Sequence, residues 1–132
     1  MSQLSLKNLR QVQRFVNGDP GFRGLGNIDL KLAIKVDKTA YLISFGGFSC
    51  HSVEKISPSR FRDSDCLIEL TGDQWNGLLI SLSSERGDGL LGLDAREGVV
   101  KAINPYKKMD LYRYLTSVEA FLRAFGQQEQ SA

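Results

Sequence analysis

The chain contains one histidine, His51, which is the side chain best suited to act as a general base near neutral pH. It follows Cys50 in a stretch that is typical of a β-strand. Because neighbouring side chains of a strand point to opposite faces, His51 should lie opposite Cys50, on the face that meets solvent. A surface or hydrogen-bonded histidine is therefore the favoured interpretation, and catalysis by His51 is the weaker alternative.

Two carboxylates, Asp65 and Glu69, are the other candidates for acid–base chemistry. A carboxylate inside an apolar cavity can have a raised pKa and shuttle protons. Asp65 stands where a strand begins and Glu69 alternates with Ile68, so turn and solvent-facing roles are favoured for them. Arg60 and Arg62 precede that strand and could pair with a ligand carboxylate at a cavity mouth, although surface solvation is favoured.

The residues that could bind a metal show no suitable spacing. His51, Cys50 and Cys66 form no paired ligand pattern, so we predict no metal site. Gly24 and Gly26 precede a strand, whereas a dinucleotide-binding loop follows a strand and opens a helix. We therefore expect no bound cofactor. Both cysteines have apolar neighbours and are expected to be buried and reduced.

Length and composition indicate one globular domain, residues 1–132. The chain is 42% hydrophobic and 24% charged, with a net charge of +2, which argues against disorder and against a nucleic-acid partner. Its densest basic cluster, Lys101, Lys107 and Lys108, is expected to be solvated surface. No stretch approaches the about 18 apolar residues that a membrane helix needs. We expect no integral membrane segment and a cytoplasmic location, and the oligomeric state is left open.

The first half of the chain predicts a helix followed by three strands. Apolar residues recur with a helical period over residues 4–16, and residues 17–27, with four glycines and a proline, form a loop. Alternation over residues 28–36 predicts a strand with one buried and one wet face. Residues 39–45 form its antiparallel hairpin partner, and a third strand is expected over residues 48–53.

The second half predicts further strands and helices. A polar connection over residues 57–62 leads to a strand over residues 65–71, and Thr71 and Gln74 open a helix with a capping box. We then expect a loop over 83–89, a strand over 99–103, a helix over 110–125 that Gly126 stops, and a disordered tail over 127–132. The elements together predict an α+β fold with a mixed, mainly antiparallel five-stranded sheet covered by helices.

The run Ser64-Asp65-Cys66-Leu67-Ile68-Glu69-Leu70-Thr71, followed by the leucine-rich segment 75–79, resembles the sterol-carrier-protein family of lipid-binding domains. Residues 28–45 are similar to the opening hairpin of that family, and residues 97–103 to its short Gly-Lys-rich strand. The resemblance covers about residues 5–125. It implies a hydrophobic tunnel between sheet and helices that takes up fatty acyl chains, sterols or similar molecules. Asn104-Pro105 departs from the family, which often has a glycine there.

The large apolar residues of the sheet and of two helices would line such a tunnel. We expect the ligand to contact Tyr41, Phe45, Trp75, Leu78, Leu79, Leu82, Tyr112, Leu115 and Phe121. The first hypothesis is a binding domain for a lipid, fatty acyl or sterol-like molecule in an internal cavity. The alternative is a small cofactor-free isomerase, cyclase or lyase that acts on an apolar metabolite there, with His51, Asp65 or Glu69 as base. A cone-shaped fold like that of ketosteroid isomerase and a protein-binding module are the remaining alternatives.

Overall fold

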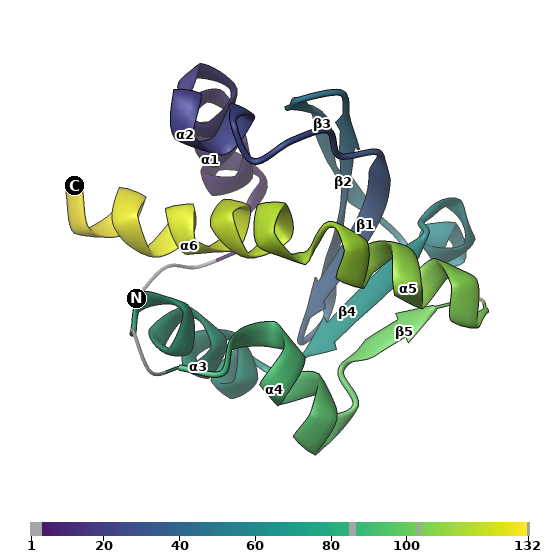
Figure 1. Ribbon diagram of the computed structural model, residues 1–132. Coiled ribbons are helices and arrows are strands. Elements are labelled where there is room, and N and C mark those ends of the chain that lie inside the picture. Colours follow the sequence, from purple (N-terminus) through teal and green to yellow (C-terminus); the bar gives the residue numbers. More distant parts are fainter. Residues whose placement is uncertain (1–3, 85–86, 103, 132) are drawn as a thin grey trace.

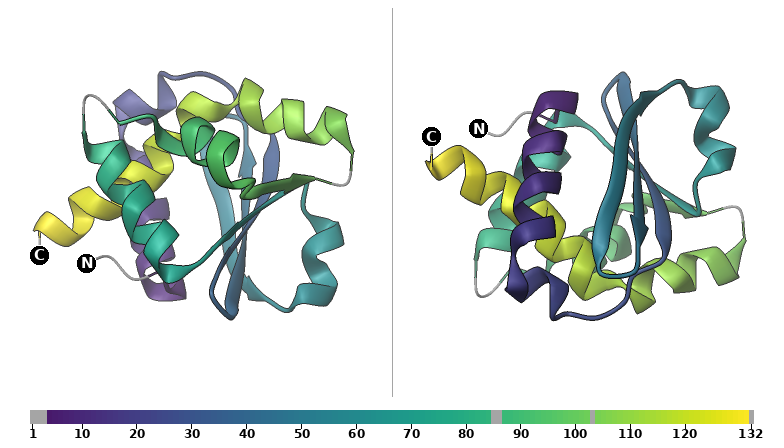
Figure 2. Two further views of the ribbon diagram at one scale, coloured as in Figure 1. Left: turned by 90° about the horizontal axis from the view of Figure 1, so that it is seen from below. Right: turned by 90° about the horizontal axis from the view of Figure 1, so that it is seen from above.

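The computed structural model describes the backbone of residues 4–84, 87–102 and 104–131 and the side chains of these ranges up to Phe125. Helices cover one face of a five-stranded sheet, and a short 3-10 helix lies on the other face (Figures 1 and 2). This arrangement confirms the predicted α+β class. The helices are α1 (Leu6–Gly18), α2 (Pro20–Arg23), the 3-10 helix η1 (Pro58–Asp63), α3 (Gly72–Ser83), α4 (Gly89–Glu97), α5 (Pro105–Arg113) and α6 (Leu115–Ser131).

The sheet has the strand order β3-β2-β1-β4-β5. β1 (Leu30–Val36) and β2 (Thr39–Gly46) form the expected antiparallel hairpin, and β3 (Ser49–Ile56) continues it. β4 (Cys66–Leu70) pairs with β1 in parallel, and β5 (Val100–Ala102) closes the sheet antiparallel to β4. The predicted mixed, mainly antiparallel sheet of five strands is therefore confirmed.

Alternate strand residues bury one face of the sheet against the helices. Leu32, Ile34 and Ile43 are at most 1% exposed, as are Leu9 of α1 and Leu122 of α6. α6 runs across the middle of this face, with α1 and α2 to one side of it and α3 and α4 to the other (Figure 1). The removal of this apolar surface from water is the main driving force for folding.

The opposite face of the sheet is only partly wet, which corrects the expectation of a fully solvated face. Residues 57–62 were expected to be only a polar connection, but η1 forms there because Pro58 presets the helical backbone at its first position. Phe61 of η1 packs on the sheet. Four strand residues are buried in this second apolar cluster: Ala33, Ala40, Leu42 and Ile56.

Two amide side chains of α1 bind the backbone of the edge strand β3. Asn17 Oδ1 accepts from Cys50 N at 2.7 Å, and Asn17 Nδ2 donates to Cys50 O at 2.8 Å, as a neighbouring strand would. Gln13 Nε2 donates to the same carbonyl at 3.1 Å. Unpaired backbone groups of an edge strand otherwise invite pairing with other chains. Asn17 and Gln13 therefore satisfy the edge of β3 at this point.

α4 is a helix that the sequence analysis did not predict. Its apolar residues Leu90 and Leu93 are buried and one turn apart, and Gly98 ends it with a positive φ of 61°. A helical period needs more than two buried positions to be recognised, and the nine residues of α4 supply few. The segment between Gly89 and Glu97 therefore folds as a short helix on tertiary contacts rather than on a strong pattern.

The last helix of the prediction is two helices. Asn104 and Pro105, expected to end a strand, open α5 instead: Asn104 Oδ1 accepts from Lys107 N at 3.1 Å, and proline is favoured at the first helical position. The helix is interrupted at Tyr114, and α6 begins at the next residue. Gly126 does not stop α6, which runs on through residues with good helix propensity. Residue 103, the predicted end of the fifth strand, lies outside the described residues.

We expect Asn17→Ala to lower the free energy of unfolding by about 1–3 kcal/mol, because the N–H of the buried Cys50 loses its acceptor. Arg14→Ala is the matched control, since Arg14 is exposed on the same helix and its loss should change stability by less than about 0.5 kcal/mol. Urea unfolding followed by circular dichroism measures both. Equal stabilities of the two variants would contradict the anchoring of β3 by α1.

Candidate functional site

The residues predicted to line a ligand cavity come together in one place. Eight of the nine belong to a single contiguous apolar cluster between the sheet and the helices, and Tyr112 is the exception. Two of the eight, Leu79 and Leu115, are half-buried. The other six are buried: Tyr41, Phe45, Trp75, Leu78, Leu82 and Phe121. The sequence therefore located the apolar interior, and whether these side chains contact a ligand stays a prediction.

Aromatic rings occupy the middle of this interior. Phe121 of α6 meets Phe45 of β2 edge to face, with ring centroids 5.3 Å apart. Phe125, one turn further along α6, meets Trp75 of α3 at 5.5 Å. The rings of Phe121 and Phe125 are 6.2 Å apart, so the four side chains form one continuous chain of aromatic contacts. Phe125 was not among the predicted residues, although it continues the helical period of Phe121.

A groove lies between α3 and α4 on the outside of the apolar interior. It has a volume of about 480 Å³, within the range of small-molecule sites. Leu78 and Leu93, both buried, form its floor, and both are also part of the apolar cluster. The rim is polar, with Asp73, Asp88, Arg96 and Glu97 among its residues. This groove combines an apolar floor with a polar margin, the composition expected of a site for a mainly apolar molecule.

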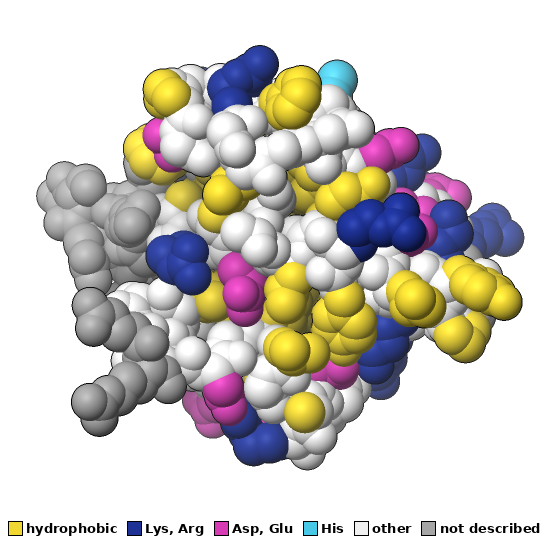
Figure 3. All heavy atoms as spheres, in the orientation of Figure 1, with side chains coloured by type: hydrophobic (Ala, Val, Ile, Leu, Met, Phe, Trp, Pro, Cys, Tyr) yellow, Lys and Arg dark blue, Asp and Glu magenta, His cyan; other side chains and the backbone are white. Residues whose placement is uncertain are grey.

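A seam of apolar side chains borders α4 on its other side. In Figure 3 these side chains gather between α4 and the α5–α6 helices. Leu91 of α4 is 51% exposed, and Leu115 at the start of α6 is half-buried. α4 therefore has the α3–α4 groove on one side and exposed apolar side chains on the other.

The amino-terminal end of α4 is held by two side chains. Ser81 Oγ accepts from Gly89 N, and Glu119 Oε2 of α6 accepts from Leu90 N, each at 2.9 Å. Gly89 has a positive φ of 62°, and an added β-carbon would collide with Glu119 Oε2. The positive φ favours glycine here, and a larger residue would also displace the Glu119 carboxylate that holds Leu90 N.

The other end of α4 is held by Asp94, which the sequence analysis missed together with its helix. Asp94 is 8% exposed, and its carboxylate accepts from Val100 N at 2.8 Å and from Tyr112 OH at 2.5 Å. Lys108 Nζ lies 3.0 Å from the same oxygen as the tyrosine hydroxyl. This network joins α4, β5 and α5, and it explains why Tyr112 does not belong to the apolar cluster.

The pKa values in this network follow from its contacts. Burial raises the pKa of Asp94, but the hydrogen bonds from Tyr112 and Val100 and the charge of Lys108 outweigh it, so the net pKa lies below the usual value of 3.8. Burial and the hydrogen bond to Asp94 raise the pKa of Tyr112 to about 12. Asp94 is therefore ionised and Tyr112 protonated at neutral pH.

The three predicted acid–base candidates lie outside the apolar interior. His51 is exposed at a bulge of β3, and its Nε2 is 2.9 Å from Gly46 O. Glu69 points from the opposite face of the sheet and pairs with Lys101 and Lys35, which lower its pKa. His51 and Glu69 are thus placed as the solvent-facing interpretation predicted.

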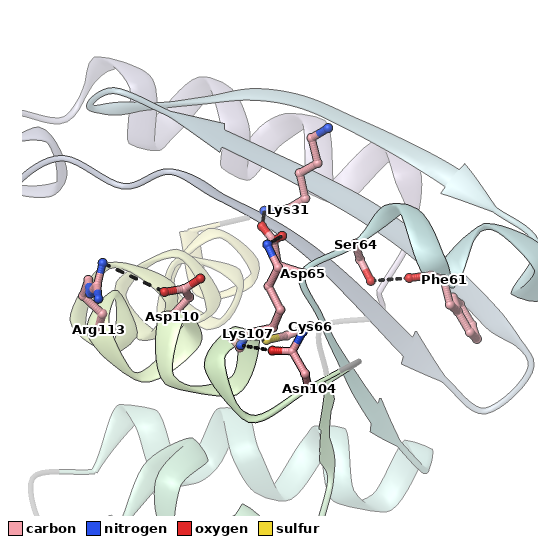
Figure 4. A network of polar contacts seen from close by, with 9 residues as sticks. All are labelled: Lys31, Phe61, Ser64, Asp65, Cys66, Asn104, Lys107, Asp110 and Arg113. Carbon is pink, nitrogen blue, oxygen red and sulfur yellow. Dashed lines mark hydrogen bonds and ion pairs between the residues drawn. The ribbon is translucent and has the colours of Figure 1, made fainter.

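Asp65 holds three segments of the fold together. Its Oδ2 accepts from the backbone N of Lys31 in β1 at 2.9 Å, and Lys107 of α5 binds its Oδ1 at 3.0 Å (Figure 4). The hydrogen bond to Asp65 raises the pKa of Lys107. Arg60, one of the two arginines expected before this strand, pairs with Glu54 and Asp63. The structure does not bring His51, Asp65 and Glu69 together.

The cysteines, the possible metal ligands and the helices were also compared with the sequence predictions. Cys50 and Cys66 are free and buried as predicted, and burial raises their pKa to about 12 and about 11, which makes both poor nucleophiles. Among the residues with known placement, no group of three His, Cys, Asp or Glu could hold a metal ion. Within the same ranges, no helix has the length and apolar character to cross a bilayer.

Comparison with known proteins gives two structural neighbours. No family model matches the chain, and no curated protein matches its sequence. A conserved hypothetical protein from Thermus thermophilus, described as a possible sterol carrier protein, superposes with a TM-score of 0.60 at 13% identity, over 95% of this chain and 91% of that one. The ubiquinone synthesis protein UbiJ-SCP2 superposes with a TM-score of 0.52 at 15% identity, over 94% and 97%. These likenesses establish a sterol-carrier-protein-like fold, as the sequence predicted, in place of the cone-shaped alternative.

We expect Asp94→Asn to destabilise the fold by about 1–3 kcal/mol at neutral pH, because charge-assisted hydrogen bonds are replaced by weaker ones. The folded-state pKa of Asp94 is lowered, so its stabilisation is present above its unfolded pKa and is lost as the pH falls below about 4. The two proteins should therefore converge in stability on acidification.

Urea unfolding at neutral pH and near pH 3 measures this difference. Asp29→Asn is the control, since Asp29 is exposed in the loop before β1 and carries the same change of charge. If Asp94→Asn and Asp29→Asn show the same pH dependence, the carboxylate of Asp94 does not hold α4 in place.

Proposed function

We propose that this domain binds an apolar small molecule, a lipid, fatty acyl or sterol-like compound, between the sheet and helices α3, α4 and α6. The observation that carries the proposal is that the groove and the interior share a wall: Leu78 and Leu93 line the groove and also belong to the buried apolar cluster. The apolar chain of a ligand that enters the groove would remain in contact with apolar side chains as it moves inward. Burial of such a chain contributes about 0.8 kcal/mol per methylene group.

The structural neighbours support this proposal from a second direction. One of them is described as a possible sterol carrier protein, and that description agrees in ligand class with the apolar interior of this chain. The free, buried thiols of Cys50 and Cys66 fit a reducing compartment, and we propose a cytoplasmic location on that ground.

The proposal requires α4 to move, because aromatic rings fill the interior. α4 buries Leu90 and Leu93, and its amino-terminal end is held by hydrogen bonds to Ser81 and Glu119. Helices with few buried contacts open at lower free energy than the core of a domain. We propose that displacement of α4, with rotation of the Trp75 and Phe125 rings, makes room for the ligand.

The placement of the charged candidates favours binding without chemistry. His51 and Glu69 face solvent, and Asp65 is engaged by Lys31 N and Lys107. A base must reach within about 3 Å of the proton that it removes, and these side chains lie outside the proposed ligand space. The enzyme alternative therefore gains no support from the geometry.

Gly77→Leu should weaken ligand binding by about tenfold or more, because the new side chain would fill the groove. A β-carbon at Gly77 meets no atom within 4 Å, and leucine favours the helix, so the variant should fold as well as the parent. Binding of cholesterol and of hexadecanol is measured by native mass spectrometry and by the fluorescence of Trp75, which lies in the interior.

Gly18→Leu is the matched control, since a β-carbon at Gly18 also meets nothing within 4 Å and lies on α1, away from the groove. It should bind both probes as the parent does. A parent protein that binds neither probe contradicts the proposed function, and equal binding by the two leucine variants contradicts the groove as the way in.

Glu119→Ala should speed ligand release by about tenfold, because α4 loses the acceptor at Leu90 N that holds it to α6. Glu119→Gln keeps an oxygen acceptor and should retain most of the parent rate. Stopped-flow fluorescence of Trp75 with hexadecanol measures both variants. If release is unchanged in Glu119→Ala, α4 does not limit access to the interior.

A further inference from the structure

The face of the sheet that is turned away from the helices holds a second hollow. It has a volume of about 310 Å³ and lies between η1 and the strands β4 and β5. Figure 2 shows η1 on the opposite side of the sheet from α1, α3 and α6. This hollow is therefore separated from the α3–α4 groove by the sheet itself.

The walls of this hollow are mostly apolar. Phe61 of η1 and Leu67 of β4 line it, and both are half-buried members of the small apolar cluster on this face. The backbone around Ser64 is fixed by a hydrogen bond of 2.6 Å from Ser64 Oγ to Phe61 O (Figure 4). The hollow is thus a preformed apolar surface at the lower end of the size range of small-molecule sites.

The charges around the hollow are mostly paired with one another. Asp65 binds Lys107, and Lys101 shares Glu69 with Lys35. Arg60 points from η1 to Glu54 and Asp63. These contacts engage all four carboxylates that lie near the hollow, with Arg60 shared by two of them: Glu54, Asp63, Asp65 and Glu69.

Arg62 differs from these cations. It is exposed, it lines the hollow, and within residues 4–84, 87–102 and 104–125 it has no ion pair. Lys101 lines the hollow too, and its side chain is 56% exposed although Glu69 binds it. The four cations of the ion pairs balance the four carboxylates, so the charge of Arg62 is in excess. An apolar hollow with one unpaired guanidinium at its margin is complementary to a molecule with a short apolar chain and one anionic group.

We propose that this hollow is a second binding site, which takes an amphipathic monocarboxylate. The chain of the ligand lies against Phe61 and Leu67, and its carboxylate receives two parallel hydrogen bonds from the Arg62 guanidinium, with Lys101 nearby. The planar fork of arginine matches a carboxylate in this bidentate geometry, which an ammonium group does not provide. The volume suits a chain much shorter than a membrane lipid. The site is independent of the proposed interior site, because it uses the other face of the sheet.

The full chain labelled with ¹⁵N and titrated with octanoate tests this proposal. We expect the amide signals of residues 61–67 and of Lys101 and Ala102 to shift, and octanol, which lacks the charge, to bind about tenfold more weakly. Arg62→Gln should weaken octanoate binding about tenfold, and Arg62→Lys should give an intermediate loss. Arg14→Gln, an equal change of charge on the exposed face of α1, should bind octanoate as the parent does.

Leu67→Thr is a second, independent variant, because threonine favours a strand but removes most of the apolar surface that Leu67 contributes to the hollow. It should weaken octanoate and octanol to the same extent. Equal binding of octanoate and octanol, unchanged affinity in Arg62→Gln, or no shift at residues 61–67 would each overturn the proposal. So would a response to acidic peptides but not to octanoate.

Gly77→Leu separates this site from the interior site. Octanoate binding at residues 61–67 should survive that substitution, whereas the fluorescence response of Trp75 to hexadecanol should not. If octanoate shifts only the signals of α3 and α4 and is lost in Gly77→Leu, the second site does not exist and the interior site does. If hexadecanol fails to bind and octanoate binding still depends on Arg62, the opposite holds.

Discussion

The packing of α6 across the sheet is the interaction on which the rest of the structure depends. Phe121 and Phe125 lie one turn apart on this helix, and through them β2, α6 and α3 are joined by ring contacts of 5.3, 6.2 and 5.5 Å. Edge-to-face pairs add about 0.5–1.5 kcal/mol each to the burial of the rings. α1 and α3 then fill the space to either side of α6, and the edge strand β3 is completed by Asn17 rather than by another strand. The position of one helix thus sets the space available to all the others.

α4 is attached to this core in a different manner. Polar contacts hold both of its ends, at Leu90 N through Glu119 and at Asp94 through Tyr112 and Val100. Hydrogen bonds contribute about 1 kcal/mol each when both partners can return to water, while aromatic burial contributes several times more for each side chain. α4 also buries Leu90 and Leu93, but α6 buries four large apolar side chains: Val118, Phe121, Leu122 and Phe125. Displacement of α4 therefore exposes less apolar surface and needs less free energy than displacement of α6. On this comparison, α6 forms a stable side of the apolar interior, and α4 forms the side that is easier to displace.

The sequence predicted most of the framework, because alternation and capping residues are local features. The hairpin of β1 and β2 follows from strict alternation, and the start of α3 from the reciprocal hydrogen bonds of Thr71 and Gln74. It did not predict α4, which has only two buried leucines, or the helix start at Asn104-Pro105, where a strand end and a helix cap have the same composition. Asp94 was missed because no local pattern marks it: Val100 lies just beyond the turn that ends α4, Tyr112 lies in a later helix, and the two meet Asp94 only in the folded chain. The apolar residues of the interior were predictable from residue type, and the hydrogen bonds that hold α4 over them were not.

The two faces of the sheet differ in what they could admit, and the difference is electrostatic. On the helical side, the carboxylate of Asp94 already accepts three donors, and Glu119 is occupied by the backbone of α4. A charged group brought into that space would lose its hydration without gaining a free partner, at a cost of several kcal/mol. On the other side, Arg62 remains hydrated and available beside Phe61 and Leu67. The interior should therefore accept uncharged ligands, or keep a charged head at the polar rim of the groove, and the hollow under η1 should discriminate in favour of an anion. One sheet, with its apolar residues alternating between two faces, could in this way separate ligands by charge as well as by size.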